Sequence, residues 1–313
     1  MIRFIGRRLL LMVPVILGMS FILFAIMNLT PGDPARLILG EGATQADVDQ
    51  LREEMGLNEN FFVRYVQYII NALHGDFGKS YRTRIPVSSE LLARFPTTLK
   101  LAFGGMFLAV IVGIPVGIIS AIRQYSFIDN VSMITALLLT SIPVFWLGLL
   151  LILLFSLRLD ILPATGIDTW RNYIMPSFVL AASTMAMLIR MTRSTMLEVI
   201  RQDYIRTAKA KGADPKRVVM KHALRNALLP VVTLIGMNFG IQLGGTVITE
   251  SVFAIPGLGN LMITSVRMKD TPMLMASVLF SALVAGLVNL AVDVFYIFID
   301  PRLKSTFVRT RRA

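Results

Sequence analysis

Residues 206–215 read Arg-Thr-Ala-Lys-Ala-Lys-Gly-Ala-Asp-Pro, and a basic segment follows them as far as residues 229–230. The pattern predicts one helix that ends at Gly212 and a second helix that begins with Asp214 as N-cap and Pro215 in the first turn, because glycine favours the position after a helix and proline the first position within one. Long apolar runs flank this polar hairpin on both sides. A basic hairpin between two membrane spans is a docking surface for a partner on the same side of the membrane.

The composition indicates an integral membrane protein. Of the 313 residues, 55% are hydrophobic and only 16% are charged, whereas a soluble domain carries about 25% charged residues. Roughly 20 apolar residues of helix cross a hydrocarbon core, and helices satisfy their own backbone hydrogen bonds there. We therefore predict an all-α membrane protein with six transmembrane helices. The charge-free runs that predict them are residues 9–32, 101–122, 130–157, 172–189, 226–249 and 271–292.

The distribution of basic residues predicts the orientation. With a cytoplasmic N-terminus, 19 of the 31 lysines and arginines fall on the inner side and 12 on the outer side. Eight of those 12 lie in residues 33–100, so the short outer loops carry only four. This is the positive-inside pattern, with both termini in the cytoplasm. The net charge of +12 is thereby explained by topology, which argues against a nucleic-acid partner.

The N-terminal apolar stretch resembles a secretory signal, because three arginines precede it. A cleaved signal has a shorter apolar core and a small-residue cleavage site, so we expect a retained first helix here.

The four expected segments follow from these spans. They are the N-terminus and first span (1–30), an extracytoplasmic helical segment (31–98), a five-helix core (99–300) that includes the hairpin (197–230), and a basic cytoplasmic tail (301–313). Within the extracytoplasmic segment, apolar periodicity and capping residues predict three short helices. These helices cover residues 44–55, 61–73 and 87–95, the last ending before Pro96.

Several chemistries are excluded by the residues present. The chain has no cysteine and only two histidines, His74 and His222, which fall on opposite sides of the predicted membrane. A thiolate nucleophile, a disulfide and a His-rich metal site are therefore excluded, and we expect no catalytic residue, metal or cofactor in this chain. Residues 75–80 (Gly-Asp-Phe-Gly-Lys-Ser) resemble the end of a phosphate-binding loop, but Leu73 stands where that motif needs glycine and a helical pattern precedes it. We interpret them as a turn.

Two carboxylates in or beside apolar runs are candidates for function. Asp293 lies within an apolar stretch, where we expect a structural partner rather than a proton relay. Glu250 begins the last outer loop and is either a polar helix end or part of an element at the outer mouth. That element would also include Pro256, Gly257 and Gly259.

The hairpin itself has two interpretations. A basic amphipathic helix adsorbs on anionic lipid. However, a glycine stop followed directly by a capped start fixes the angle between two helices, which a helix inserting into a protein groove requires and lipid adsorption does not. We favour a protein partner.

Residues 204–212 (Tyr-Ile-Arg-Thr-Ala-Lys-Ala-Lys-Gly) and 222–230 (His-Ala-Leu-Arg-Asn-Ala-Leu-Leu-Pro) resemble the EAA loop of bacterial ABC-importer permeases, in the variant of the dipeptide, oligopeptide and nickel group. Arg206 and Thr207 replace the first two residues of the general motif, while Ala208 and Gly212 keep their places. Shorter matches in the same order extend over nearly the whole chain, among them Gly75-Asp76-Phe77-Gly78 and Pro256-Gly257-Leu258-Gly259. The resemblance implies that an ATPase-coupling loop comprises Tyr204, Arg206, Thr207, Ala208, Gly212, Asp214, Pro215, His222, Arg225, Asn226, Leu229 and Pro230.

The sequence is similar to the first of the two permease subunits of dipeptide permeases. This implies a bacterial inner-membrane protein that works with a second homologous permease, two cytoplasmic ATPases that bind ATP and Mg²⁺, and an extracytoplasmic solute-binding protein. Di- and oligopeptides are the expected substrates, with nickel chelates, glutathione and oligosaccharides as alternatives. A secondary transporter independent of any ATPase remains the alternative of a different class.

Overall fold

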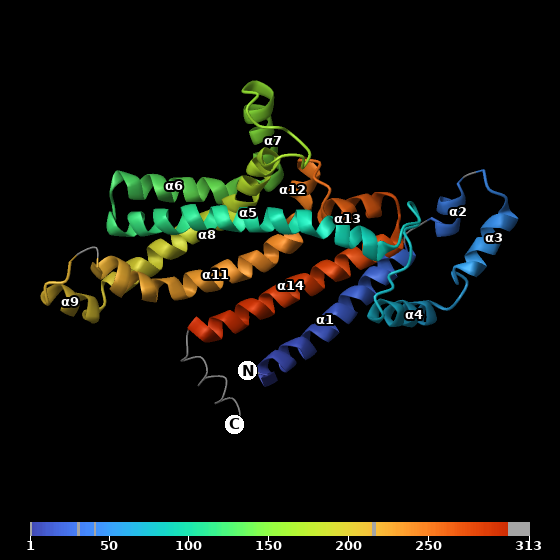
Figure 1. Ribbon diagram of the computed structural model, residues 1–313, viewed down its shortest axis with the longest axis horizontal. Coiled ribbons are helices and arrows are strands. Elements are labelled where there is room, and N and C mark those ends of the chain that lie inside the picture. The colour runs from blue at the N-terminus through green and yellow to red at the C-terminus, as the bar shows by residue number, and fades with distance from the viewer. Residues whose placement is uncertain (1, 30–31, 41, 215–216, 300–313) are drawn as a thin grey trace. The chain divides into compact units, whose positions relative to one another are not determined.

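The computed structural model describes residues 2–29, 32–40, 42–214 and 217–299, and these residues form helices without any strand (Figure 1). A single isolated bridge joins Lys79 to Pro86. The α-helices are α1 (Ile2–Leu29), α2 (Pro34–Leu39), α3 (Gln45–Glu54), α4 (Phe61–Leu73), α5 (Val87–Ile122), α6 (Phe127–Ser141), α7 (Val144–Leu151), α8 (Ile174–Ile200), α9 (Asp203–Ala210), α11 (Leu224–Gly245), α12 (Val247–Val252), α13 (Leu258–Arg267) and α14 (Thr271–Ile299).

Five helices are long and apolar enough to cross a membrane, and they correspond to five of the six predicted runs. The remaining run, 130–157, forms two helices bent by 105° at a short break, so the number of spans is five, or six if the bent pair is one. The break lies at Ser141-Ile142-Pro143, where Ile142 is extended, with φ −78° and ψ 124°. A proline disfavours helical geometry in the residue before it, which explains why the helix ends at this point.

The chain divides into two compact units, Met1–Thr98 with Ala254–Gly286, and Leu99–Phe253 with Leu287–Ala313. In the first unit, the segment between α1 and α5 is built from capped short helices. Thr44 accepts a hydrogen bond from the Asp47 backbone at the start of α3, as predicted, and Gly56 follows that helix in a left-handed conformation (φ +64°). Helix α4 has its predicted bounds.

Aromatic rings join α4 to α1 within the first unit. The centroids of Phe24 and Phe61 are 5.1 Å apart, and Tyr65 contacts both Phe21 and Phe24. The helix therefore packs through a patch centred on Phe61 and Tyr65, whereas Leu73 at its end is 82% exposed.

The prediction of a separate helix over 87–95 is wrong, because α5 continues through Pro96 without a break. Packing compensates for the backbone hydrogen bond that proline removes. Phe95, next to Pro96, stacks edge-on against Phe280 with 5.1 Å between ring centroids. Val87 and Leu91 on the same helix are buried in a cluster with residues of α13 and α14.

In the second unit, a row of small residues on α5 lets it approach α8. Gly105, Gly113 and Gly117 recur at multiples of four residues, and the buried Ala109 completes the row. A Cβ placed on Gly117 would lie 2.6 Å from the Cβ of Thr192. The glycines of this span therefore serve close helix packing, as membrane helices commonly use them.

Candidate functional site

The first arm of the predicted hairpin is α9, a separate helix rather than the direct extension of α8. Helix α8 ends at Ile200, and the chain turns through Arg201 and Gln202 before α9 begins at Asp203. The turn brings Ile205, which is fully buried, against the core of the unit. In Figure 1, α9 lies at the end of α8 and α11.

The glycine stop was predicted correctly. Gly212 has φ +77°, and its N–H donates to the carbonyl of Lys209 at 2.9 Å while the Ala213 N–H donates to that of Ala208 at 3.2 Å. This pair of bonds is the Schellman arrangement that ends helices on a left-handed residue. A Cβ on Gly212 would meet nothing within 4 Å, so the backbone conformation, and not lack of space, calls for glycine here.

Asp214 caps the second arm as predicted, because its carboxylate accepts the Arg217 N–H at 3.2 Å. Pro215 lies outside the described residues. The second arm then runs as a π-helical segment, Val218–Ala223, directly into α11. Pro230 lies inside α11 and does not interrupt it. The second arm and its spanning helix therefore form one continuous rod.

An apolar cluster joins the two arms to the spanning helices. Ile205 of α9 and Val218 of the second arm are buried with Met196 of α8 and Ala121 of α5. Across the hairpin, the Asn226 amide donates to the Tyr204 hydroxyl at 2.8 Å. Two residues of the predicted loop, 22 positions apart, are thus brought together and fix the arms against each other.

The other predicted loop residues divide between surface and core. Arg206, Thr207, Gly212, Asp214, Arg225 and Pro230 are exposed, whereas Ala208, His222 and Leu229 are partly buried. The Arg206–Asp203 ion pair is long at 3.8 Å and both side chains are more than three-quarters exposed, so it contributes little to stability. The hairpin therefore presents a polar, mainly basic surface on an apolar support.

The sequence alone did not reveal an ion pair near this hairpin that involves a buried carboxylate. Asp129 at the start of α6 accepts two hydrogen bonds from Arg193 of α8, at 2.6 and 2.8 Å. The same carboxylate accepts the Ser120 hydroxyl of α5 at 2.5 Å and the Tyr125 N–H at 2.8 Å. The Asp129 carboxylate therefore links α5, α6 and α8. Arg193 lies seven residues before the end of α8 at Ile200.

Both charged residues lie just outside the charge-free runs, where charged residues are common, so neither stands out in the sequence. The local signal was Ser126, three positions before Asp129 and bonded to its backbone N–H at 3.3 Å as a helix N-cap.

The residues predicted for an outer-mouth element are divided between the two units. Glu250 lies in α12 and is fully buried, so the expectation that it begins a loop is wrong. Its backbone N–H donates to the Thr246 carbonyl at 2.8 Å, which continues the helical geometry after α11. Pro256, Gly257 and Gly259 belong to the other unit, where Gly257 precedes α13.

No group of three or more histidine, aspartate or glutamate side chains is arranged to hold a metal ion within the described ranges. Residues 75–80 begin with the turn that was predicted, since Gly75 has φ +79° at the end of α4.

Two family models match most of the chain. Residues 113–305 match the binding-protein-dependent transport system inner membrane component, and residues 1–102 match the N-terminal part of such membrane components. The chain belongs to this family, and it is a multi-pass permease subunit of an ABC importer. By family it is not an enzyme, because ATP hydrolysis resides in separate subunits.

Curated relatives agree with this assignment over almost their full length. The chain is 42% identical to the glutathione transport system permease protein GsiC of Escherichia coli (strain K12) over 304 residues, covering 97% of this chain and 99% of the relative. The same values hold for the protein of that name from Shigella dysenteriae serotype 1 (strain Sd197).

Among solved structures, a chain of the MetNI methionine ABC transporter in an inward-facing conformation matches with a TM-score of 0.57. Its sequence identity is 20%, and the match covers 67% of this chain and 96% of that chain. This likeness concerns the fold alone.

Proposed function

We propose that this permease imports short peptides and that the hairpin of residues 197–230 couples it to ATPase subunits. The complete importer would contain a second homologous permease, two ATPases and an extracytoplasmic solute-binding protein. The hairpin with its glycine stop, aspartate cap and Tyr204–Asn226 hydrogen bond is the observation that carries this proposal.

The hairpin suits coupling because it can move only with the helices that carry it. Its second arm is continuous with α11, and its first arm shares a buried cluster with α8. A push on the exposed surface of α9 is therefore transmitted to two spanning helices and not absorbed by a flexible loop. Closure of the ATPases would shift the pathway between outward and inward access in this way.

The orientation follows from charge. Ten of the 31 lysines and arginines lie between Arg190 and Arg225, and the positive-inside rule favours a cytoplasmic position for such a segment. Both termini would then also be cytoplasmic, and the segment between α1 and α5 would face outward.

Short peptides are the proposed substrate class because the sequence resembles dipeptide permeases and the curated relatives are named for glutathione, itself a tripeptide. Glutathione is accordingly the first peptide to test. Nickel chelates and oligosaccharides are the less favoured alternatives.

The test is uptake by the reconstituted importer in proteoliposomes. Labelled dialanine and glutathione should accumulate only when ATP and the solute-binding protein are both present. Accumulation by the isolated permease, without ATPase subunits, would instead establish a secondary transporter.

A further inference from the structure

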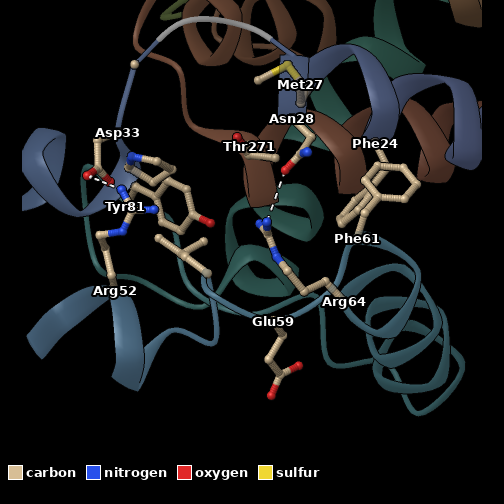
Figure 2. A pocket seen from close by; sticks show the side chains of 13 residues that line it. Phe24, Met27, Asn28, Asp33, Arg52, Glu59, Phe61, Arg64, Tyr81 and Thr271 are labelled. Carbon is tan, nitrogen blue, oxygen red and sulfur yellow. Dashed lines mark hydrogen bonds and ion pairs between the residues drawn. The ribbon is translucent and has the colours of Figure 1, made fainter. Parts of the chain in front are cut away.

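A polar cavity of about 470 Å³ lies in the first unit, between the end of α1, the segment that follows it and the start of α14 (Figure 2). Volumes of this order accommodate small organic ligands. Asn28 and Phe24 of α1, Arg64 and Phe61 of α4, Tyr81 and Thr271 line it.

The two arginines of the cavity differ in their partners. Arg52 forms an ion pair with Asp33 at 2.8 Å, which neutralises its charge. Arg64 donates to the Asn28 side-chain oxygen at 3.0 Å and lies over the Phe24 ring at 5.8 Å, but among the described residues it forms no ion pair with a carboxylate. Glu59, which also lines the cavity, points away from Arg64 in Figure 2. A partly buried guanidinium is thus left with donors for an anion.

Tyr81 supplies a second donor from the opposite wall. Its hydroxyl points into the same space as the Arg64 guanidinium (Figure 2). Burial raises the pKa of Tyr81 to about 12, with nearby Arg64 opposing the shift, so the phenol keeps its proton. The loop that carries it is held firmly, because Asp270 accepts hydrogen bonds from the Ser80 hydroxyl and from the Tyr81 N–H.

We propose that this cavity binds the carboxylate end of a short peptide, with Arg64 and Tyr81 as donors to the carboxylate and the rings of Phe24 and Phe61 as an apolar wall for the adjoining side chain. A guanidinium fork matches the two oxygens of a carboxylate. The Asn28 amide and the Thr271 hydroxyl are available for the peptide group. The inference rests on the proposed function. Within it, the cavity is an outward-facing site that binds the peptide before transport, here called the holding site, and it is distinct from the coupling hairpin.

A peptide is favoured over the phosphate of a lipid headgroup by the lining itself. The hydrogen-bonding groups come from four separate parts of the chain, at Asn28, Arg64, Tyr81 and Thr271, and surround the space. Acyl chains would need a continuous apolar exit, whereas a short peptide offers donors and acceptors along its length.

The experiment measures binding of dialanine, dialanine amide and glutathione to the purified importer in nanodiscs, without the solute-binding protein. Dialanine and glutathione should bind the wild type more tightly than the amide, which lacks the carboxylate. Arg64→Gln should weaken dialanine binding by about 10- to 100-fold, the size expected for a charged hydrogen-bonded pair, and Arg64→Lys by less. The matched control is Arg36→Gln, since Arg36 is exposed on α2 and does not line the cavity.

Three results would overturn the inference. They are equal binding of dialanine and its amide, equal losses in the Arg64 and Arg36 variants, and an Arg64-dependent phospholipid, detected by native mass spectrometry, that dialanine does not displace. Unchanged melting temperatures of the variants exclude misfolding as the cause of a loss. ATP-dependent uptake by the same wild-type importer, reconstituted in proteoliposomes, separates the two claims, because peptide uptake without an effect of Arg64→Gln on binding refutes only the holding site.

Discussion

Replacement of Gly212 by alanine tests the coupling hairpin most sharply, because the structure isolates a single physical effect. The added Cβ would meet nothing within 4 Å, so no steric clash accompanies the change. What remains is the cost of holding an L-residue at φ +77°, about 1–2 kcal/mol. That cost would lower the equilibrium population of the observed turn, relative to other conformations, by roughly 5- to 30-fold.

We therefore expect Gly212→Ala to lower ATP-driven uptake by about that factor, with normal amounts of protein in the membrane. Gly212→Val should lower it further, to near zero, because a β-branched residue fits the left-handed region less well. Gly212→Asn should retain most of the activity, since asparagine tolerates this conformation.

The assay is uptake of labelled peptide by proteoliposomes containing the whole importer, alongside its ATPase rate. Gly244→Ala is the matched control, because Gly244 is helical, has open space at its Cβ position and does not have a positive φ. Wild-type uptake by both Gly212→Ala and Gly212→Val would refute the argument that this turn must be rigid.

Three further predictions concern stability and the joining of the hairpin arms. Asp129→Asn should lower the free energy of unfolding by about 3 kcal/mol, because it leaves a largely buried arginine without its carboxylate. The control is Asp203→Asn, at a 97% exposed side chain, which should change the free energy of unfolding by less than about 0.5 kcal/mol. Equal melting temperatures of the two variants would contradict this prediction. A double-mutant cycle of Tyr204→Phe and Asn226→Ala should give a coupling energy of about 0.5–1.5 kcal/mol in thermal unfolding, and strict additivity would show that their hydrogen bond does not join the arms. Gly117→Ala should cost about 1–3 kcal/mol by overpacking α5 against α8, measured as a lower melting temperature, whereas unchanged stability would mean that the helices can separate freely.

Local signals in the sequence predicted local structure well. The glycine stop at Gly212, the caps at Asp214 and Thr44 and the bounds of α4 each depend on a few neighbouring residues. Charge-free runs also predicted the long helices, since a membrane span is one contiguous apolar stretch and its signal is likewise local in the sequence.

Tertiary packing decided the features that the sequence did not reveal. Pro96 reads as the end of a helix, yet packing around Phe95 carries α5 through it. The Asp129–Arg193 pair joins residues 64 positions apart, and neither charge is unusual in its own segment. Glu250 is likewise buried in α12, a helix that packs on α7 and α8, which are distant from it in the chain.

The central claim is that the hairpin faces the cytoplasm and contacts an ATPase subunit. The natural chain has no cysteine, so a single Lys209→Cys substitution at an exposed position of α9 provides a unique label. In membranes containing the assembled importer, a short thiol-to-amine cross-linker at this position should capture an ATPase subunit, and an impermeant thiol reagent added to intact cells should not react. Labelling from outside the cell, or the absence of any ATPase adduct in an importer that transports normally, would contradict the account.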